Sequence, residues 1–305
     1  LQNSERDVAA FVRRAVDPRE FAVSVTLDRE NAPRFINAHR TRPGSEAVGV
    51  FISPEYSLLP MFEGTLDGRP VRLLVDPTSP ANWTSLDRAR QFGLTPLGPP
   101  LVYGLPEHVP DASRGALCAA QTLQIELLPV EAVLFYARPV RGPLWPLCRS
   151  ADAREVDAVL GWSFLRAFET VRWELPARRI VFSSRRDLEV DSSPHVLARL
   201  PLEPNYGLMV VKGTIEGQTR PLLLDLAGEF ELAMASPPPA PVRQVTMGDV
   251  VLRELRANGL EELGLGFPDL ARVGLKALGR YVVVLDNHRN EVRIERPTTA
   301  ERVMP

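Results

Sequence analysis

The alternation of apolar and polar residues predicts one N-terminal helix followed mostly by short β-strands. Apolar residues recur at helical spacing from Val8 to Ala15, ahead of the helix-breaking Pro18. Between Phe21 and Ile52, prolines and a glycine interrupt short apolar runs, a pattern typical of extended segments. We therefore expect a mainly β protein with an N-terminal extension.

A thirteen-residue pattern occurs twice at a constant offset of 149 residues. Residues 64–76 read GTLDGRPVRLLVD, residues 213–225 read GTIEGQTRPLLLD, and six of the thirteen positions are identical. In each copy an acidic residue and a glycine separate two β runs, and the second run ends on an aspartate. Each copy therefore predicts a hairpin that carries an aspartate at its end.

A second pattern recurs downstream of each hairpin, at residues 159–182 and 273–294. Each copy has a glycine (Gly161 or Gly274), a short helical turn, an aromatic residue, a strand, a polar turn and a final strand. The order of hairpin, glycine turn and second hairpin thus occurs twice, so the chain contains two copies of one β-rich unit.

These paired elements resemble the retropepsin-like and pepsin-like aspartic proteases, in a bacterial two-lobed form. In that family a strand of each lobe ends in hydrophobic residues and Asp-Thr-Gly, and a later hydrophobic-hydrophobic-Gly segment crosses beneath it. The matching residues here are 73–76 and 157–161 in the first copy, and 222–225 and 272–274 in the second. The resemblance covers roughly residues 56–296 and implies two β-barrel-like lobes related by a pseudo-dyad.

The expected organisation has four parts. They are the N-terminal extension at 1–55, lobe one at 56–187, a linker at 188–199 and lobe two at 200–305.

The resemblance implies that Asp76 and Asp225 form a catalytic dyad. One proton shared by two close carboxylates lets one act as a base on water while the other donates to the substrate carbonyl. Ser79 is the expected support of the Asp76 carboxylate, because many pepsin-like sequences have a serine there that bonds the carboxylate. A structural reading is also open for each aspartate alone, since an aspartate at a strand end often accepts N–H bonds within its own turn.

Three further residues are expected to contact substrate. Thr78 and Gly228 lie beside the two aspartates in the sequence, and Tyr103 lies in the segment 99–115, where the family carries a flap over the cleft. The alternative for that segment is a surface loop that packs on another subunit.

Both motifs depart from the family at the same two positions. Pro77 and Leu226 replace the threonine whose hydroxyl bonds across the dyad, and Thr78 and Ala227 replace the glycine that allows a close backbone approach. Catalytic groups that are held less firmly in the productive orientation give a much lower reaction rate. We therefore expect a weak or inactive peptidase that serves as a binding or accessory subunit of a larger assembly. The alternative is an active aspartic endopeptidase that cleaves extended peptides.

Composition narrows the set of partners. The 36 basic and 38 acidic residues give a net charge of −2, so we expect a peptide or protein partner rather than nucleic acid. No apolar run is long enough for a membrane-spanning segment. The four histidines are too scattered to predict a metal site, so no cofactor is expected.

Cys118 and Cys148 fit one disulfide or two buried thiols. Together with a first residue, Leu1, that is not Met, they favour an extracytoplasmic location, periplasmic or secreted, in a bacterium.

Overall fold

The structure is a computed structural model that describes most of the chain. It covers residues 44–79, 81–96, 115–138, 156–185, 194–203, 208–263 and 270–298, and the backbone of 24–27, 33–37 and 40–41. The predicted helix from Val8 to Ala15 lies outside the described residues. The short strands β1 (Ser24–Leu27) and β2 (Pro33–Asn37) pair with each other.

Lobe one is an eight-stranded sheet that closes on itself. Its strands are β3 (Arg40–Thr41), β5 (Met61–Leu66), β6 (Arg69–Val75), β7 (Trp83–Ser85), β8 (Thr95–Pro96), β9 (Ala116–Ile125), β10 (Leu128–Arg138) and β11 (Ala158–Leu160), accompanied by the helices α2 (Leu86–Phe92) and α3 (Trp162–Leu165). The strand order is β3-β10-β7-β11-β6-β5-β9-β8, and β10 also pairs with β9. This additional pairing turns the sheet into a barrel-like lobe.

Lobe two repeats this arrangement in a seven-stranded sheet. Its elements are β15 (Val210–Ile215), β16 (Gln218–Asp225), β17 (Leu232–Met234), β18 (Val242–Met247), β19 (Val250–Leu255), β20 (Ala257–Gly259), β21 (Ala271–Gly274) and the helix α4 (Leu275–Leu278). The order β18-β15-β16-β21-β17-β20 matches β9-β5-β6-β11-β7-β10 of lobe one. Strands β19 and β20 together take the place of β10, since β19 pairs with β18 and β20 with β17.

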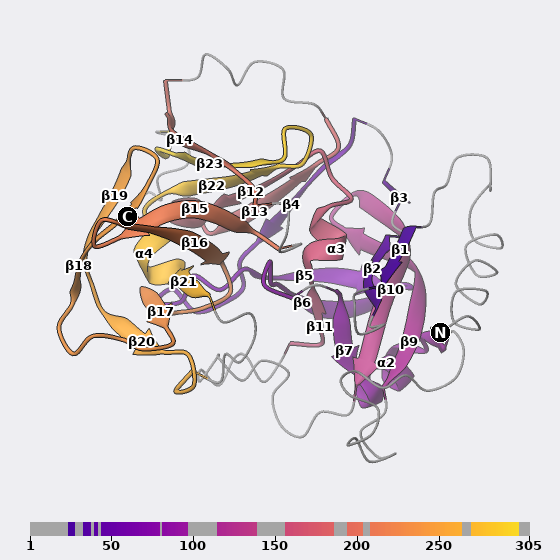
Figure 1. Cartoon of the computed structure of the whole chain (residues 1–305). Coiled ribbons are helices and arrows are strands. Elements are labelled where there is room, and N and C mark those ends of the chain that lie inside the picture. The colour runs from indigo at the N-terminus through magenta and orange to yellow at the C-terminus, as the bar shows by residue number, and fades with distance from the viewer. Residues whose placement is uncertain are drawn as a thin grey trace.

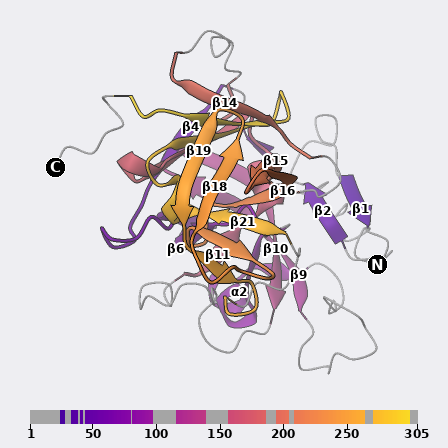
Figure 2. The same cartoon turned by 60° about the vertical axis from the view of Figure 1, so that its left-hand side comes forward.

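A third sheet of six strands joins the lobes. It consists of β4 (Glu46–Val50), β12 (Thr170–Glu174), β13 (Arg179–Ser183), β14 (Val196–Pro201), β22 (Val282–Asp286) and β23 (Glu291–Glu295), and the 3₁₀ turn η4 (Leu175–Ala177) connects β12 to β13. The order is β14-β23-β22-β12-β13-β4, so the C-terminal hairpins of the two lobes pair through β12 and β22 (Figure 1). The turned view in Figure 2 brings β18 and β19 of lobe two to the front, with strands of lobe one behind them. The predicted fold class, mainly β with two barrel-like lobes, is confirmed.

The two predicted hairpins, β5–β6 and β15–β16, have the same turn. Asp67 and Gly68 have φ of 48° and 80°, and Glu216 and Gly217 have φ of 49° and 78°. Two consecutive residues with positive φ are the requirement of a type I′ turn, whose twist matches that of paired strands. The repeated acidic-Gly pair therefore sets the register of both strands that end on an aspartate.

The two recurring glycines lie where backbone segments cross. A β-carbon at Gly161 would lie 2.4 Å from the carbonyl oxygen of Ala81, and one at Gly274 would lie 2.3 Å from that of Phe230. Neither neighbour is a flexible side chain. Both positions therefore require glycine for space.

We expect Gly274→Ala to lower the free energy of unfolding by about 1–3 kcal/mol, because overpacking forces the crossing segments apart. Urea unfolding measures this loss. Gly259→Ala is the matched control in the same lobe, since the atoms nearest to a β-carbon there belong to the flexible side chain of Glu262, at 3.3 Å. Similar losses for both variants would contradict the role of the crossing.

Most buried apolar side chains of both lobes form one continuous core, and Phe230, Ala233 and Leu260 of lobe two form a small separate cluster. Residues 73–75 of β6 and 222–224 of β16 are completely buried within the continuous core. Each strand thus reaches the core just before its aspartate. Within the described ranges, no helix combines the length and the apolar character needed to cross a membrane.

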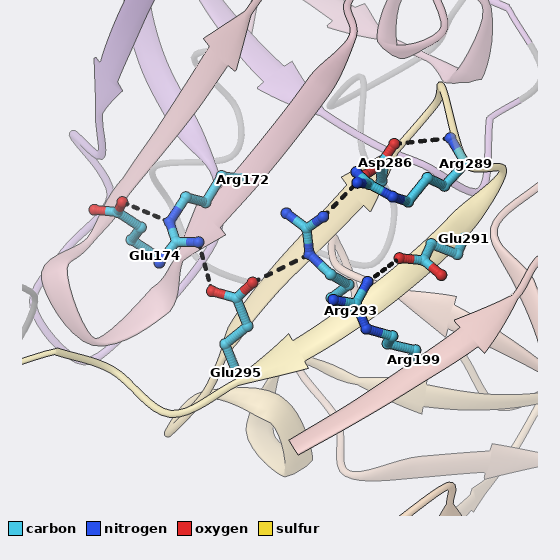
Figure 3. Close-up of polar contacts among 8 residues, drawn as sticks. All are labelled: Arg172, Glu174, Arg199, Asp286, Arg289, Glu291, Arg293 and Glu295. Carbon is cyan, nitrogen blue, oxygen red and sulfur yellow. Dashed lines mark hydrogen bonds and ion pairs between the residues drawn. The ribbon is translucent and has the colours of Figure 1, made fainter. Parts of the chain in front are cut away.

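One face of the joining sheet carries a chain of ion pairs (Figure 3). The Arg293 guanidinium lies 2.8 Å from the carboxylate of Asp286 and 3.2 Å from that of Glu295. Arg172 then connects Glu295 to Glu174, at 2.6 and 2.9 Å. Two further pairs extend the chain, Arg179–Glu174 and Arg289–Asp286, and the pair Arg199–Glu291 lies beside it. Because Arg172 belongs to lobe one and Glu295 to lobe two, these ion pairs connect the lobes.

Candidate functional site

The two aspartates occupy equivalent positions in the two lobes. Asp76 follows β6 and Asp225 ends β16, and each lies beside a parallel neighbour strand, β11 or β21. Only 1% of Asp76 and none of Asp225 is exposed to solvent. The repeat thus places two buried carboxyl groups at the ends of matching strands.

In lobe one, a tight turn holds the carboxylate of Asp76. The backbone N–H of Thr78 donates to Asp76 Oδ1 over 2.9 Å, and the Thr78 hydroxyl donates to the same oxygen over 2.7 Å. The N–H of Ser79 donates to the carbonyl oxygen of Asp76 over 3.2 Å. Since these donors belong to Thr78 and Ser79, the missing N–H of Pro77 leaves these bonds of the turn intact.

Lobe two keeps the same backbone pattern. The N–H of Ala227 donates to Asp225 Oδ1 over 3.2 Å, and the N–H of Gly228 donates to the Asp225 carbonyl oxygen over 3.4 Å. The altered side chains therefore leave both turns closed by equivalent backbone bonds. An aspartate with a purely structural role at the end of a strand would also accept local N–H bonds of this kind.

The hydroxyl that supports Asp76 is that of Thr78. The Ser79 hydroxyl, the expected support, instead donates to the carbonyl oxygen of Ala81 over 2.8 Å. The backbone carbonyl oxygen of Ser79 accepts the N–H of Trp162 over 2.7 Å, which connects the turn to the crossing at Gly161. A sequence motif alone does not distinguish two neighbouring hydroxyls, because their directions depend on the turn.

Of the three residues expected to contact substrate, two lie in these turns. Thr78 is partly exposed, whereas Gly228 is buried and its carbonyl oxygen accepts the N–H of Leu275 over 2.8 Å. A β-carbon at Gly228 would meet the ring of Phe230 at 2.2 Å. Tyr103 lies outside the described residues, and its expected role stays a prediction.

Arg272 is a residue of the site that the motif comparison passed over. It is 2% exposed, and its Nη1 lies 3.4 Å from Asp225 Oδ2. Arg272 stands opposite Leu223 on the parallel strand, two residues before Asp225, so the two side chains project from the same face. The signal in the sequence was a charged residue within an otherwise apolar strand.

Burial and mutual repulsion govern the ionisation of the two carboxyl groups. Burial, together with the nearby charge of Asp225, raises the pKa of Asp76 to about 7, against the hydrogen bonds of Thr78 and the charge of Arg272. Burial also raises the pKa of Asp225, which the charge of Arg272 and the N–H groups of Ala227 and Gly228 oppose. Both carboxyl groups therefore favour the protonated form, and for Asp76 the charge of Asp225 adds to the effect of burial.

We expect Thr78→Val to raise the pKa of Asp76, because the hydroxyl of Thr78 stabilises the ionised carboxylate and valine has no hydroxyl. Unfolding by urea should show a loss of roughly 1–3 kcal/mol at pH 8, where Asp76 is ionised, and a smaller loss at pH 5. Ser79→Ala is the matched control, since its hydroxyl bonds a carbonyl oxygen and its loss should not depend on pH. An equal loss at both pH values for Thr78→Val would show that the hydroxyl does not act on the carboxylate.

The remaining chemistry-bearing groups form no second site in the described part of the chain. No three His, Cys, Asp or Glu residues among those described are arranged to hold a metal ion. Cys118 is a buried free thiol, and burial raises its pKa to about 11. Cys148 lies outside the described residues.

Comparisons with known proteins add little to this picture. No protein-family model and no curated protein sequence matches the chain. Among solved structures it is similar to basic 7S globulin from soybean, with a TM-score of 0.47 and 12% identity, over 84% of this chain and 96% of that one. The chemistry of the site therefore rests on its own residues.

Proposed function

We propose that the chain is a weak peptidase of the aspartic-protease type, in which Asp76 and Asp225 activate water between the two lobes. The observation that carries this proposal is the matched placement of two buried carboxyl groups, each at the end of an equivalent strand and held by the same turn in its own lobe. The charge of Asp225, which raises the pKa of Asp76, supports their proximity. Two close carboxylates of this kind share one proton, which is the state that aspartic proteases use.

The reaction starts with Asp225 ionised and Asp76 protonated. Asp225 takes a proton from water as the water oxygen bonds to the peptide carbon, and Asp76 gives its proton to the carbonyl oxygen. Asp225 then passes its proton to the amide nitrogen while Asp76 recovers its own from one of the two hydroxyls. The carbon–nitrogen bond breaks, and water has been consumed to give an acid and an amine.

Two features support low activity. Arg272 stabilises ionised Asp225 and so weakens it as a base for water. The family's threonine hydroxyl in lobe two is replaced by the side chain of Leu226, which is completely buried.

A cleavage assay on an unfolded protein substrate between pH 4 and pH 9 tests the proposal. We expect slow cleavage, detected by mass spectrometry, that declines above about pH 7 as Asp76 loses its proton. An absence of product at every pH, or cleavage that persists in Asp76→Asn, would reject it.

A second candidate function is a binding or accessory subunit with no catalysis. The specific observation in its favour is the closed site, since both aspartates, Leu226 and Ala227 have at most 1% of their surface exposed. In that case the protein isolated from its own cells should migrate in gel filtration as a complex, equally for wild type and Asp76→Asn. Migration of both as a monomer would remove this candidate.

A further inference from the structure

The two lobes differ in charge at one position on the strands that cross beside the aspartates. Arg272 on β21 stands opposite Leu223, and Val159 on β11 stands opposite Leu74, so the two residues are equivalent in the repeat. Val159 is completely buried, as an apolar residue at this place in the core should be. Arg272 is nearly as buried yet carries a charge, which makes the site electrostatically asymmetric.

The charges of the site balance when it holds one proton. Among the described residues, the charges named as acting on the pair are those of Asp225 and Arg272, while Thr78, Ala227 and Gly228 contribute hydrogen bonds. One proton on the pair leaves one negative charge, which the guanidinium neutralises. Since an uncompensated buried charge is costly, Arg272 favours this singly protonated state.

The guanidinium of Arg272 also stabilises one of the two carboxylates more than the other. Its Nη1 lies 3.4 Å from Asp225 Oδ2, an ion pair between two side chains that are both almost fully buried. Among the named causes that shift the pKa of Asp76, the charge of Arg272 is the weakest. For Asp225 the same charge is the strongest of the causes that lower the pKa, against the increase caused by burial. The negative charge is therefore more stable on Asp225.

We propose that Arg272 is a positioning residue of the dyad, which holds Asp225 as the carboxylate and so keeps the shared proton on Asp76. The inference rests on the proposed function for its catalytic meaning: Asp225 is then the base and Asp76 the acid. Without Arg272 the preference for Asp225 would be lost, and the Thr78 hydroxyl, which bonds Asp76, would stabilise part of the negative charge on Asp76.

Carbon-13 NMR of protein labelled at the aspartate carboxyl carbons tests this assignment without any substrate. The variants Asp76→Asn and Asp225→Asn identify the two signals. In wild type we expect Asp225 to lose its proton first and Asp76 to lose its proton near pH 7. In Arg272→Met, both signals should follow both titration steps, and the first step should rise by about one pH unit or more.

Arg272→Lys is the matched variant, since it keeps the charge and should keep the wild-type order. If Arg272→Met does not fold, the wild type and the lysine variant still decide the question. Loss of the first proton from Asp76 in wild type, or an unchanged titration in Arg272→Met, would overturn the proposal. The predicted titration in a protein that cleaves nothing would instead reject the peptidase and leave the role of Arg272 standing.

Discussion

Asp76→Asn is expected to abolish cleavage and, at the same time, to stabilise the protein above pH 7. Loss of the proton donor should reduce the cleavage rate by roughly 10²–10⁴-fold. The gain in stability follows from the pKa of Asp76, which folding raises from 3.8 to about 7.

The pH dependence of this gain can be derived from linkage. The folded protein holds the Asp76 proton more tightly than the unfolded chain does, so the wild type loses stability as pH rises from about 4 to about 7. Asparagine does not titrate, and its Oδ1 still accepts the Thr78 bonds. At pH 8 the variant should therefore unfold with a free energy that is higher by up to about 4 kcal/mol. Urea titrations at pH 4 and pH 8 measure the difference.

Asp225→Asn is the matched control. It should also abolish cleavage, but it removes the ion pair with the buried Arg272, so its gain in stability at neutral pH should be smaller than that of Asp76→Asn. The two substitutions thus remove the same chemistry with unequal effects on stability. Equal stability changes for both variants would contradict the asymmetry of the site.

Arg293→Met is expected to lower the free energy of unfolding by about 3–5 kcal/mol. Arg293 and Asp286 are each 1% exposed, and removal of the guanidinium leaves Asp286 and Glu295 as buried carboxylates without this partner. Breaking one side of a buried ion pair costs this much because the remaining charge cannot regain its hydration. Thermal and urea unfolding both report the loss.

The exposed pair Arg90–Asp87 provides the control for Arg293. Both of its side chains are more than three-quarters exposed, so Arg90→Met should stay within about 0.5 kcal/mol of wild type. A comparably small effect of Arg293→Met would show that the ion pairs between the lobes contribute nothing specific.

The features that the sequence predicted are those that repeat. The hairpins that end on Asp76 and Asp225 and the crossings at Gly161 and Gly274 are each specified within a few neighbouring residues, and two copies make the pattern visible. Turn geometry and close backbone contacts depend on those residues directly, so local reasoning suffices.

The polar side chains beside these elements were not predictable in the same way. Arg272 interrupts an apolar strand and Arg293 looks like an ordinary charged residue in the sequence, but only the pairing of distant strands shows that both are buried. The choice of Thr78 over Ser79 as the support of Asp76 is set by the direction of a hydroxyl within one turn. Such details follow from strand register and turn shape, which a linear pattern does not contain.

The joining sheet has a consequence for the order in which the protein folds on the ribosome. Strands β4, β12 and β13 come from the first 183 residues, but the partner of β12 on its other side, β22, begins only at Val282. At synthesis rates of about 5–20 residues per second, β12 remains an open edge for several seconds. An open edge pairs readily with other chains, although the charges of Arg172 and Glu174 reduce this risk. A chain truncated after Ser184 should therefore self-associate more than the full chain, as gel filtration would show.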